Sequence, residues 1–406
     1  MATKQSSSVA TDSNPQELPL RSLPPLITAG LTALMLAGCS SASMSSSTER
    51  SQQPAATSAT TTSWHENIAE GSSGLERLAC PGNGICWATG ENGRIFHLSD
   101  GHWVQFASPT TSSLYGISCP SMTDCWAVGA LAPTASEAPS SFIEHYDGRT
   151  WTQVASPSYP GVPESGLFAV SCPSETDCWA AGIGGDQNST PRIGHLLVLH
   201  FAGRRWVLAS APSPQAGDST NADALIACYS SRQCILLRSF AIEEEHSDAE
   251  AGDIFTGRNW STLDVPSTVL IQGLSCVRTN DCYAIGGENS NGPMSDYHFD
   301  GRSWTPGPQL PDTLEGHPVA WRGLSCLSHE ACWAVGGAPV STTDASGPAV
   351  VARLENGAWA FVSSPRHLGE LRDVACLAPS RCWAVGAAPT SGATVSPGPL
   401  AMQLGS

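Results

Sequence analysis

The sequence predicts an all-β fold, a seven-bladed β-propeller of four-stranded antiparallel blades, and three observations lead to it. Fourteen of the 15 cysteines fall into seven pairs, with five residues between the members of each pair. The phrase Cys-Trp-Ala-Val-Gly, or a variant of it, begins at the second cysteine of most pairs. In six copies a tight turn and a strand that opens with tryptophan follow. Seven copies of about 40 to 55 residues, each with four short strands, are typical of a propeller.

The cysteine pairs are predicted to be disulfides, one in each blade. Paired cysteines are oxidised outside the cytoplasm, and an N-terminal export signal, described below, places the chain there. Zinc is the alternative, but structural zinc sites use two facing pairs with ligands about two to four residues apart. Each disulfide should stabilise its copy by about 2 kcal/mol by restricting the unfolded chain. We place one in the innermost hairpin of every blade: Cys80–Cys86, Cys119–Cys125, Cys172–Cys178, Cys228–Cys234, Cys276–Cys282, Cys326–Cys332 and Cys376–Cys382.

Turn residues indicate how the strands connect. Asn92-Gly93 lies between two apolar runs, which is a strong signal for a hairpin. The second and third strands of the first copy are therefore neighbours. Asp-Gly turns at Asp147 and Asp300 join the third strand of their copies to the fourth. Because the disulfide ties the first two strands, each copy becomes a four-stranded antiparallel meander.

The two ends of the chain predict a closed ring. The seventh copy stops after a third strand near Leu400–Leu404 and lacks its tryptophan strand. Trp64 lies ahead of the first copy, as Trp151 lies ahead of the third. We predict that the N-terminal strand around Trp64 completes the last blade, because this closure covers two sheet edges.

Composition fits a turn-rich β protein and excludes some partners. Charged residues make up 14% of the chain, which has 39 Gly and 30 Pro, whereas about 25% charged residues is usual. The formal net charge is −17, with only 19 Lys and Arg. Nucleic acid is excluded as a partner because phosphate binding needs a clustered basic surface. One continuous repeat array predicts a single propeller domain over residues 62–406, and we expect a monomer.

The N-terminal region is predicted to be a lipoprotein signal peptide over residues 1–38. An apolar run follows Lys4 and Arg21 and is too short to span a bilayer. It ends in Leu36-Ala37-Gly38-Cys39, which resembles the bacterial lipobox and implies lipid attachment at Cys39. The alternatives are an ordinary signal peptide and an uncleaved anchor. Residues 39–61, rich in Ser and Thr, are expected to be a flexible tether. We expect an exported protein, held at the extracytoplasmic side of the cell membrane through its lipid anchor only.

The candidate site is predicted on the face that carries the long loops. The connections of variable length all emerge there, and propellers bind ligands on such faces. Trp321 is a further candidate as a sugar-stacking platform, with core packing as its alternative, because Leu or Ile takes its position in other copies. The remaining candidates lie four residues before the first cysteine of their copies: Glu76, Tyr115, Phe168, Gln272, Arg322 and Arg372.

No catalytic motif is present. The chain has no Gly-x-Ser-x-Gly, no His-Glu-x-x-His and no phosphate-binding glycine loop. We therefore predict no catalytic residue, metal or cofactor. The phrase Cys-Pro-Ser-x-x-x-Cys-Trp-Ala-Val-Gly resembles repeats of exported actinobacterial proteins, which implies a propeller and no particular activity. The Asp-Gly-x-x-Trp turns at Asp147 and Asp300 are distantly similar to the Asp-box hairpins of sialidase-like propellers.

The sequence favours a binding module for a protein or a cell-surface glycan. Whether the chain is an enzyme stays open, with the balance against it. The alternative is a carbohydrate-active propeller enzyme, a glycosidase or lyase, which needs two carboxyl groups that converge at the channel mouth.

Overall fold

The computed structural model describes the repeat region in fourteen stretches. All lie in one compact unit, Ala59–Ser406. The predicted signal peptide, Cys39 and the tether lie outside the described residues. These are 63–66, 74–82, 84–133, 138–158, 162, 164–186, 193–210, 223–242, 247–266, 270–287, 293–339, 347–362, 369–388 and 398–405.

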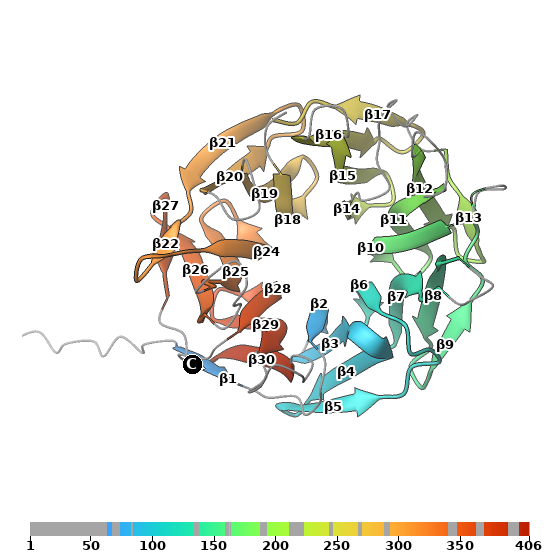
Figure 1. The fold of residues 1–406 in the computed structure, drawn as a ribbon, viewed down its shortest axis with the longest axis horizontal. Helices are drawn as coiled ribbons and strands as arrows, with labels where there is room; N and C mark the ends of the chain where they lie inside the picture. The colour runs from blue at the N-terminus through green and yellow to red at the C-terminus, as the bar shows by residue number, and fades with distance from the viewer. Residues whose placement is uncertain are drawn as a thin grey trace, which may run out of the picture. The chain divides into compact units, whose positions relative to one another are not determined.

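The described strands form seven four-stranded antiparallel sheets arranged as a ring (Figure 1). Blades 1 and 2 contain β2 (Leu75–Gly82), β3 (Ile85–Gly90), β4 (Arg94–Ser99), β5 (His102–Phe106), then β6 (Leu114–Ser121), β7 (Asp124–Leu131), β8 (Ser140–Tyr146) and β9 (Trp151–Val154). Blades 3 and 4 contain β10 (Glu164–Ser174), β11 (Asp177–Asp186), β12 (Ile193–Phe201), β13 (Trp206–Leu208), then β14 (Asp223–Ser230), β15 (Gln233–Ile242), β16 (Ser247–Phe255) and β17 (Trp260–Leu263).

The remaining blades follow the same order. Blades 5 and 6 contain β18 (Leu270–Arg278), β19 (Asp281–Gly287), β20 (Met294–Phe299), β21 (Trp304–Gln309), then β24 (Ala320–Ser328), β25 (Ala331–Gly337), β26 (Ala349–Glu355) and β27 (Ala358–Phe361). Blade 7 contains β28 (Glu370–Ala378), β29 (Arg381–Ala388), β30 (Gly398–Gly405) and β1 (Ser63–Glu66). The first strand of each blade is nearest the centre, where it packs against the first strands of both neighbours (Figure 1). The predicted fold class is confirmed.

The ring is closed by the N-terminal strand, as predicted. β1 pairs antiparallel with β30, with Trp64 opposite Leu404. It occupies the place that the tryptophan strand takes in the other blades. The last sheet therefore contains strands from both ends of the repeat region, and the outer edge of β30 is paired.

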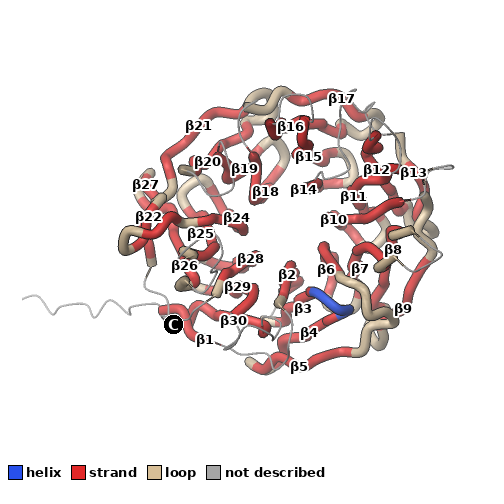
Figure 2. Tube along the Cα trace, viewed as in Figure 1, coloured by secondary structure: helices blue, strands red, loops and turns tan. Residues whose placement is uncertain are grey.

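Local chemistry explains the tight turns. Among the described residues the one helical element is η1 (Glu91–Gly93), the blue segment in Figure 2. Asn92 and Gly93 have φ values of 57° and 67°, and with Glu91 they form the three-residue turn between the paired residues Gly90 and Arg94. In the Asp-Gly turns the aspartate caps the turn, because Asp147 Oδ1 accepts bonds from the backbone N–H groups of Arg149 and Thr150 at 3.0 and 2.9 Å.

All seven predicted disulfides are present. Each joins the first and second strands of its blade beside their short turn. The Asp-Gly turn lies on the same face: a Cβ on Gly148 would lie 3.1 Å from Cβ of Thr123, in the disulfide hairpin. The disulfide turns and the Asp-Gly turns therefore share one face, opposite the connections that vary in length.

The hydrophobic core is divided among the seven interfaces between blades. Each interface buries one cluster of side chains. At four interfaces the tryptophan after the second cysteine meets the fourth-strand tryptophan of the next blade edge to face, with ring centroids 5.4 to 5.7 Å apart: Trp87–Trp151, Trp126–Trp206, Trp179–Trp260 and Trp333–Trp64. Trp64 thus makes the contact that the other fourth-strand tryptophans make.

Serine side chains add polar links between blades. The serine just before the first cysteine accepts a bond from the backbone N–H of the first cysteine in the next blade, at 2.9 to 3.1 Å. This occurs at Ser118–Cys172, Ser171–Cys228, Ser275–Cys326 and Ser325–Cys376. Alanine takes the serine position in blades 1, 4 and 7. At the closing interface, Asp373 of blade 7 instead accepts a bond from the Leu78 N–H of blade 1 at 2.8 Å.

Candidate functional site

The six candidate residues at the channel share one backbone feature. Each is the extra residue of a β-bulge near the start of the innermost strand of its blade. The bulges lie at Glu76, Tyr115, Phe168, Gln272, Arg322 and Arg372. A bulge re-aims a side chain and bends its strand. The six side chains are therefore set apart from the regular alternation of the inner strands.

The glycine of Trp-Ala-Val-Gly makes room for the bulge. A Cβ on Gly336 would lie 2.0 Å from the carbonyl oxygen of Ala320, and one on Gly386 would lie 2.0 Å from that of Glu370. Blade 4 has Arg238 at this position, and its inner strand pairs regularly there, with Ala224 opposite Arg238. Blade 4 accordingly contributes no bulge residue. The glycine is the sequence signal that marks a bulged blade.

Polar side chains from blades 5, 6, 7 and 1, charged in all but blade 5, form a network on one arc of the mouth. Arg322 Nε donates to Glu370 Oε1 at 2.6 Å, and Arg322 Nη1 donates to Gln272 Oε1 at 3.2 Å. Arg372 donates to Glu76 across the closing interface. Arg372 Nε also lies 3.9 Å from Glu370 Oε2. Blades 6, 7 and 1 are therefore linked through alternating positive and negative groups, and the neutral amide of Gln272 adds blade 5.

Two aromatic rings occupy the opposite arc. The rings of Tyr115 in blade 2 and Phe168 in blade 3 lie 5.6 Å apart, centroid to centroid. They line a cavity of about 200 Å³ with Pro139 and Ile183. Phe168 also lines the central cavity, of about 300 Å³. The mouth is thus charged on one side and aromatic on the other, and the two cavities share one wall.

Trp321 lies elsewhere. Its side chain is 1% exposed and packs between blades 5 and 6 with Tyr283 and Leu324. Its indole N–H donates to the carbonyl oxygen of Pro311 at 2.9 Å. A small hairpin follows Pro311, with β22 (Thr313–Leu314) and β23 (His317–Pro318). Trp321 is placed as a core residue and does not reach the channel.

The structure adds three residues that the sequence interpretation missed. Arg77 and Glu370 line the same cavity as Arg322 and Arg372, and Glu91 Oε1 lies 3.8 Å from Arg372 Nη1. Arg77 follows a bulge residue, and Glu370 lies two positions before one. For Arg77 and Glu370, proximity in sequence to the bulge positions was the available signal.

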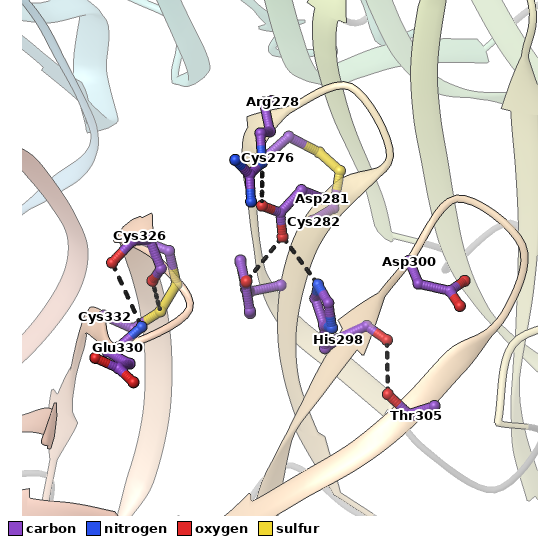
Figure 3. Close-up of polar contacts among 12 residues, drawn as sticks. Cys276, Arg278, Asp281, Cys282, His298, Asp300, Thr305, Cys326, Glu330 and Cys332 are labelled. Atoms are coloured by element: carbon purple, nitrogen blue, oxygen red, sulfur yellow. Dashed lines mark hydrogen bonds and ion pairs between the residues drawn. A yellow bond between two sulfur atoms is a disulfide. The ribbon is translucent and has the colours of Figure 1, made fainter. Parts of the chain in front are cut away.

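A second polar cluster lies on the opposite face, beside the Cys276–Cys282 disulfide (Figure 3). Asp281 accepts bonds from Tyr283 Oη and His298 Nε2 at 2.7 and 2.8 Å, and from Arg278 Nε at 2.7 Å. Burial alone would raise the pKa of Asp281, but these hydrogen bonds lower it below its ordinary value.

The same arrangement recurs in two other blades. His145 stacks on Trp126 and lies 3.4 Å from Asp124, and His200 stacks on Trp179 and lies 3.0 Å from Asp177. A cluster repeated at equivalent positions in three blades is part of the scaffold. It ties the disulfide hairpin to the third strand.

Buried carboxyl groups also lie between blades. Glu144 accepts a bond from Ser108 Oγ at 2.8 Å, and Asp296 accepts one from Trp359 Nε1 of the next blade at 3.3 Å. Burial raises the pKa of Glu144 to about 7 and that of Asp296 to about 6. Neither side chain lines the channel cavities.

Two further properties concern the described residues only. They contain no group of three or more His, Cys, Asp or Glu side chains placed to hold a metal ion. They contain no helix that is long and apolar enough to cross a membrane.

Similarity to known proteins is confined to structure. No family model and no curated protein matches the sequence. The structure of YCF48 bound to D1 peptide is similar, with a TM-score of 0.52 and 11% identity over 84% of this chain and 96% of that one. The WD40 β-propeller domain of Doa1 has a TM-score of 0.51 and 10% identity over 84% of this chain and 96% of that one. The GH74 xyloglucanase from Xanthomonas campestris has a TM-score of 0.53 and 11% identity over 80% of this chain and 53% of that one. At these identities the likeness shows a β-propeller fold alone.

Proposed function

We propose that this protein is an exported, lipid-anchored binding module that holds a segment of a protein partner at the mouth of its propeller channel. The ring of six bulges carries the proposal. The same backbone device recurs in six blades, whereas the side chain at the bulge changes from Glu to Tyr, Phe, Gln and Arg. Variation on a constant scaffold is typical of a binding surface.

The arrangement of the mouth supports a protein segment as the ligand. Charged groups and an aromatic cavity lie on opposite arcs and meet at Phe168. Successive side chains of an extended polypeptide point to opposite sides, so a charged and an apolar side chain of one segment can use both arcs at once. Of the similar propellers, YCF48 has its structure in a complex with a peptide and another is a xyloglucanase, so the choice of a protein segment rests on the arrangement of the mouth.

A carbohydrate-active enzyme is the weaker candidate. Glycosidases need one carboxyl group that donates a proton and a second that acts as base or nucleophile, about 5 to 10 Å apart. The carboxylates of Glu76 and Glu370 at the mouth accept hydrogen bonds from Arg372 and Arg322. Each is committed to neutralising a guanidinium group, which leaves neither placed as a proton donor.

Site-specific photo-crosslinking in the native exporting cell tests the proposal. A photoreactive amino acid replaces Tyr115 at the mouth, and in a matched variant it replaces Met122, which is 43% exposed on the disulfide face. We expect covalent capture of a distinct protein from position 115 and none from 122. Equal capture at both positions, or capture at neither combined with hydrolysis of polysaccharide by the purified protein, would contradict the proposal.

The lipid anchor has a separate test. Cells grown with a clickable fatty acid should label the wild-type chain and not Cys39→Ala, because the thioether needs the cysteine sulfur. The wild-type protein should sediment with membranes. Labelling of the alanine variant would refute attachment at Cys39.

A further inference from the structure

The central cavity concentrates positive charge in an acidic protein. The chain has 19 Lys and Arg against 36 Asp and Glu, yet Arg77, Arg322 and Arg372 line one cavity of about 300 Å³. Of the carboxylates, Asp373 lines this cavity, and it accepts bonds from the backbone N–H groups of Leu78 and Val374 at 2.8 and 2.9 Å. Three guanidinium groups carry more N–H donors than the carboxylates around them can accept, and positive charge gathered in a cavity attracts ligands of the opposite sign.

We infer that the site takes a peptide segment carrying a carboxylate together with a large apolar side chain, the carboxylate binding Arg77, Arg322 and Arg372. The apolar side chain enters the cavity lined by Tyr115 and Phe168. The inference rests on the proposed function and names the chemistry of the segment that the channel mouth holds.

Arg77 is the arginine best placed to receive a new carboxylate. Arg322 and Arg372 already donate to Glu370 and Glu76. Arg77 Nη1 donates to the backbone carbonyl of Glu76 at 2.9 Å, and its charge also acts on Asp373 in the same cavity, but its guanidinium group carries five N–H donors in all. A ligand carboxylate can bind its planar fork through two parallel bonds without displacing a glutamate. The rim glutamates then hold the other two arginines in place.

The neighbouring cavity has the chemistry of an apolar anchor. Tyr115, Pro139, Phe168 and Ile183 line it with several glycines, in a volume of about 200 Å³. Besides the Tyr115 hydroxyl, its wall includes the polar side chains of Glu164 and Ser165. The Ser165 hydroxyl already accepts a bond from the Ser141 N–H at 3.0 Å. A sugar ring needs several polar partners beside the stacking surface, and this cavity offers few. An aromatic or branched aliphatic side chain is its fitting occupant.

The two subsites are adjacent, because Phe168 lines both cavities. One short stretch of extended peptide therefore reaches both. The carboxylate can be the free C-terminus of a partner or an Asp or Glu side chain within it, since both present the same two oxygens. The experiment separates these sources.

The probes are short synthetic peptides of varied sequence, prepared as free acids and as C-terminal amides, beside an array of uronic-acid oligosaccharides. The protein is the oxidised chain of residues 46–406, which contains every described strand and all seven disulfides. We expect bound peptides to combine a carboxylate with an aromatic or branched apolar residue. Binding of the free acid but not the amide assigns the carboxylate to the C-terminus, and equal binding assigns it to a side chain.

Two substitutions locate the binding on the protein. Arg77→Gln should weaken binding of the best peptide by roughly tenfold to a hundredfold, the range of a charged hydrogen bond. Phe168→Ala should weaken it as much. Arg149→Gln, which changes charge equally on the disulfide face, should have no effect. Added salt should weaken binding to the wild-type protein, a measurement independent of any variant's folding.

Three results would overturn the inference. Peptide binding with no preference for a carboxylate would leave the proposed function standing and refute this chemistry. Binding of the best peptide to Arg77→Gln as tightly as to the wild type would do the same. Binding of oligosaccharides but not of peptides at the mouth would refute the protein-partner function as well.

Discussion

Trp64 should contribute more to the stability of the propeller than its place at the start of the described chain suggests. Its side chain is 2% exposed, and its ring meets that of Trp333 edge to face at 5.7 Å. Replacing a buried tryptophan by alanine removes the transfer free energy of the ring and leaves a cavity, at a cost of about 3 to 5 kcal/mol. Trp64→Ala should therefore lower the free energy of unfolding by that amount.

The matched control is Trp206→Ala in blade 3. Trp206 is 5% exposed and meets Trp126 edge to face at 5.4 Å. The cavity left by Trp206→Ala should therefore lower the free energy of unfolding as much as the cavity left by Trp64→Ala. Its strand β13, however, follows β12 of the same blade directly in the chain, whereas β1 reaches β30 only by closing the ring. Trp64→Ala should therefore also release β1 from β30.

The assay is guanidinium unfolding with the disulfides intact, combined with native-state hydrogen exchange. Both variants should unfold at lower denaturant concentration, but only Trp64→Ala should speed exchange of the amides in β30. Trp64→Phe should retain most of the stability, because the indole N–H of Trp64 has no hydrogen-bond partner among the described residues. A loss below about 1 kcal/mol, or unchanged exchange in β30, would refute the closure argument.

Three further predictions concern links between and within blades. Glu144→Gln should stabilise the protein at pH 8 by up to about 3 kcal/mol and have little effect at pH 4. Burial raises the pKa of Glu144 from 4.5 to about 7 in the folded state. The contribution of Glu144 to stability is therefore present below pH 4.5 and is lost as the pH rises through 7. Equal effects of the substitution on thermal melts at both pH values would contradict this. Ser325→Ala removes the acceptor of the Cys376 N–H at 3.1 Å and should cost about 1 to 2 kcal/mol in denaturant unfolding, whereas no change would show that the bond adds nothing. Replacing Cys276 and Cys282 together by serine should cost about 2 kcal/mol, and a larger loss would point to a role beyond closing the hairpin.

The architecture was predictable because repetition makes a weak local signal strong. One cysteine pair or one Asp-Gly turn has several interpretations, but seven pairs at constant spacing and six tryptophan strands have one. The missing seventh tryptophan strand pointed directly to Trp64, and β1 takes that place.

The candidate site was predictable only in outline. Counting four residues back from each first cysteine located six positions, and the structure places all six at bulges. The count did not reveal the bulge, since a bulge is a mismatch in pairing between two strands. Trp321 was ambiguous for a related reason: its alignment with Leu75 and Leu114 favoured the core, while its aromatic ring suggested a binding platform. The hairpin that covers it, β22 and β23, has no counterpart among the other described blades.

The sequence by itself determined the seven blades, the seven disulfides and the strand that closes the ring, because the cysteine spacing recurs in every copy and the seventh copy lacks the tryptophan strand that Trp64 supplies. Only the tertiary structure decided which side chains share the channel mouth. Arg372 meets Glu76, and Arg322 meets Glu370, across interfaces between blades. These neighbours are far apart in sequence or lie in different repeats, so the curvature of the ring brings them together, and no spacing within one repeat encodes it.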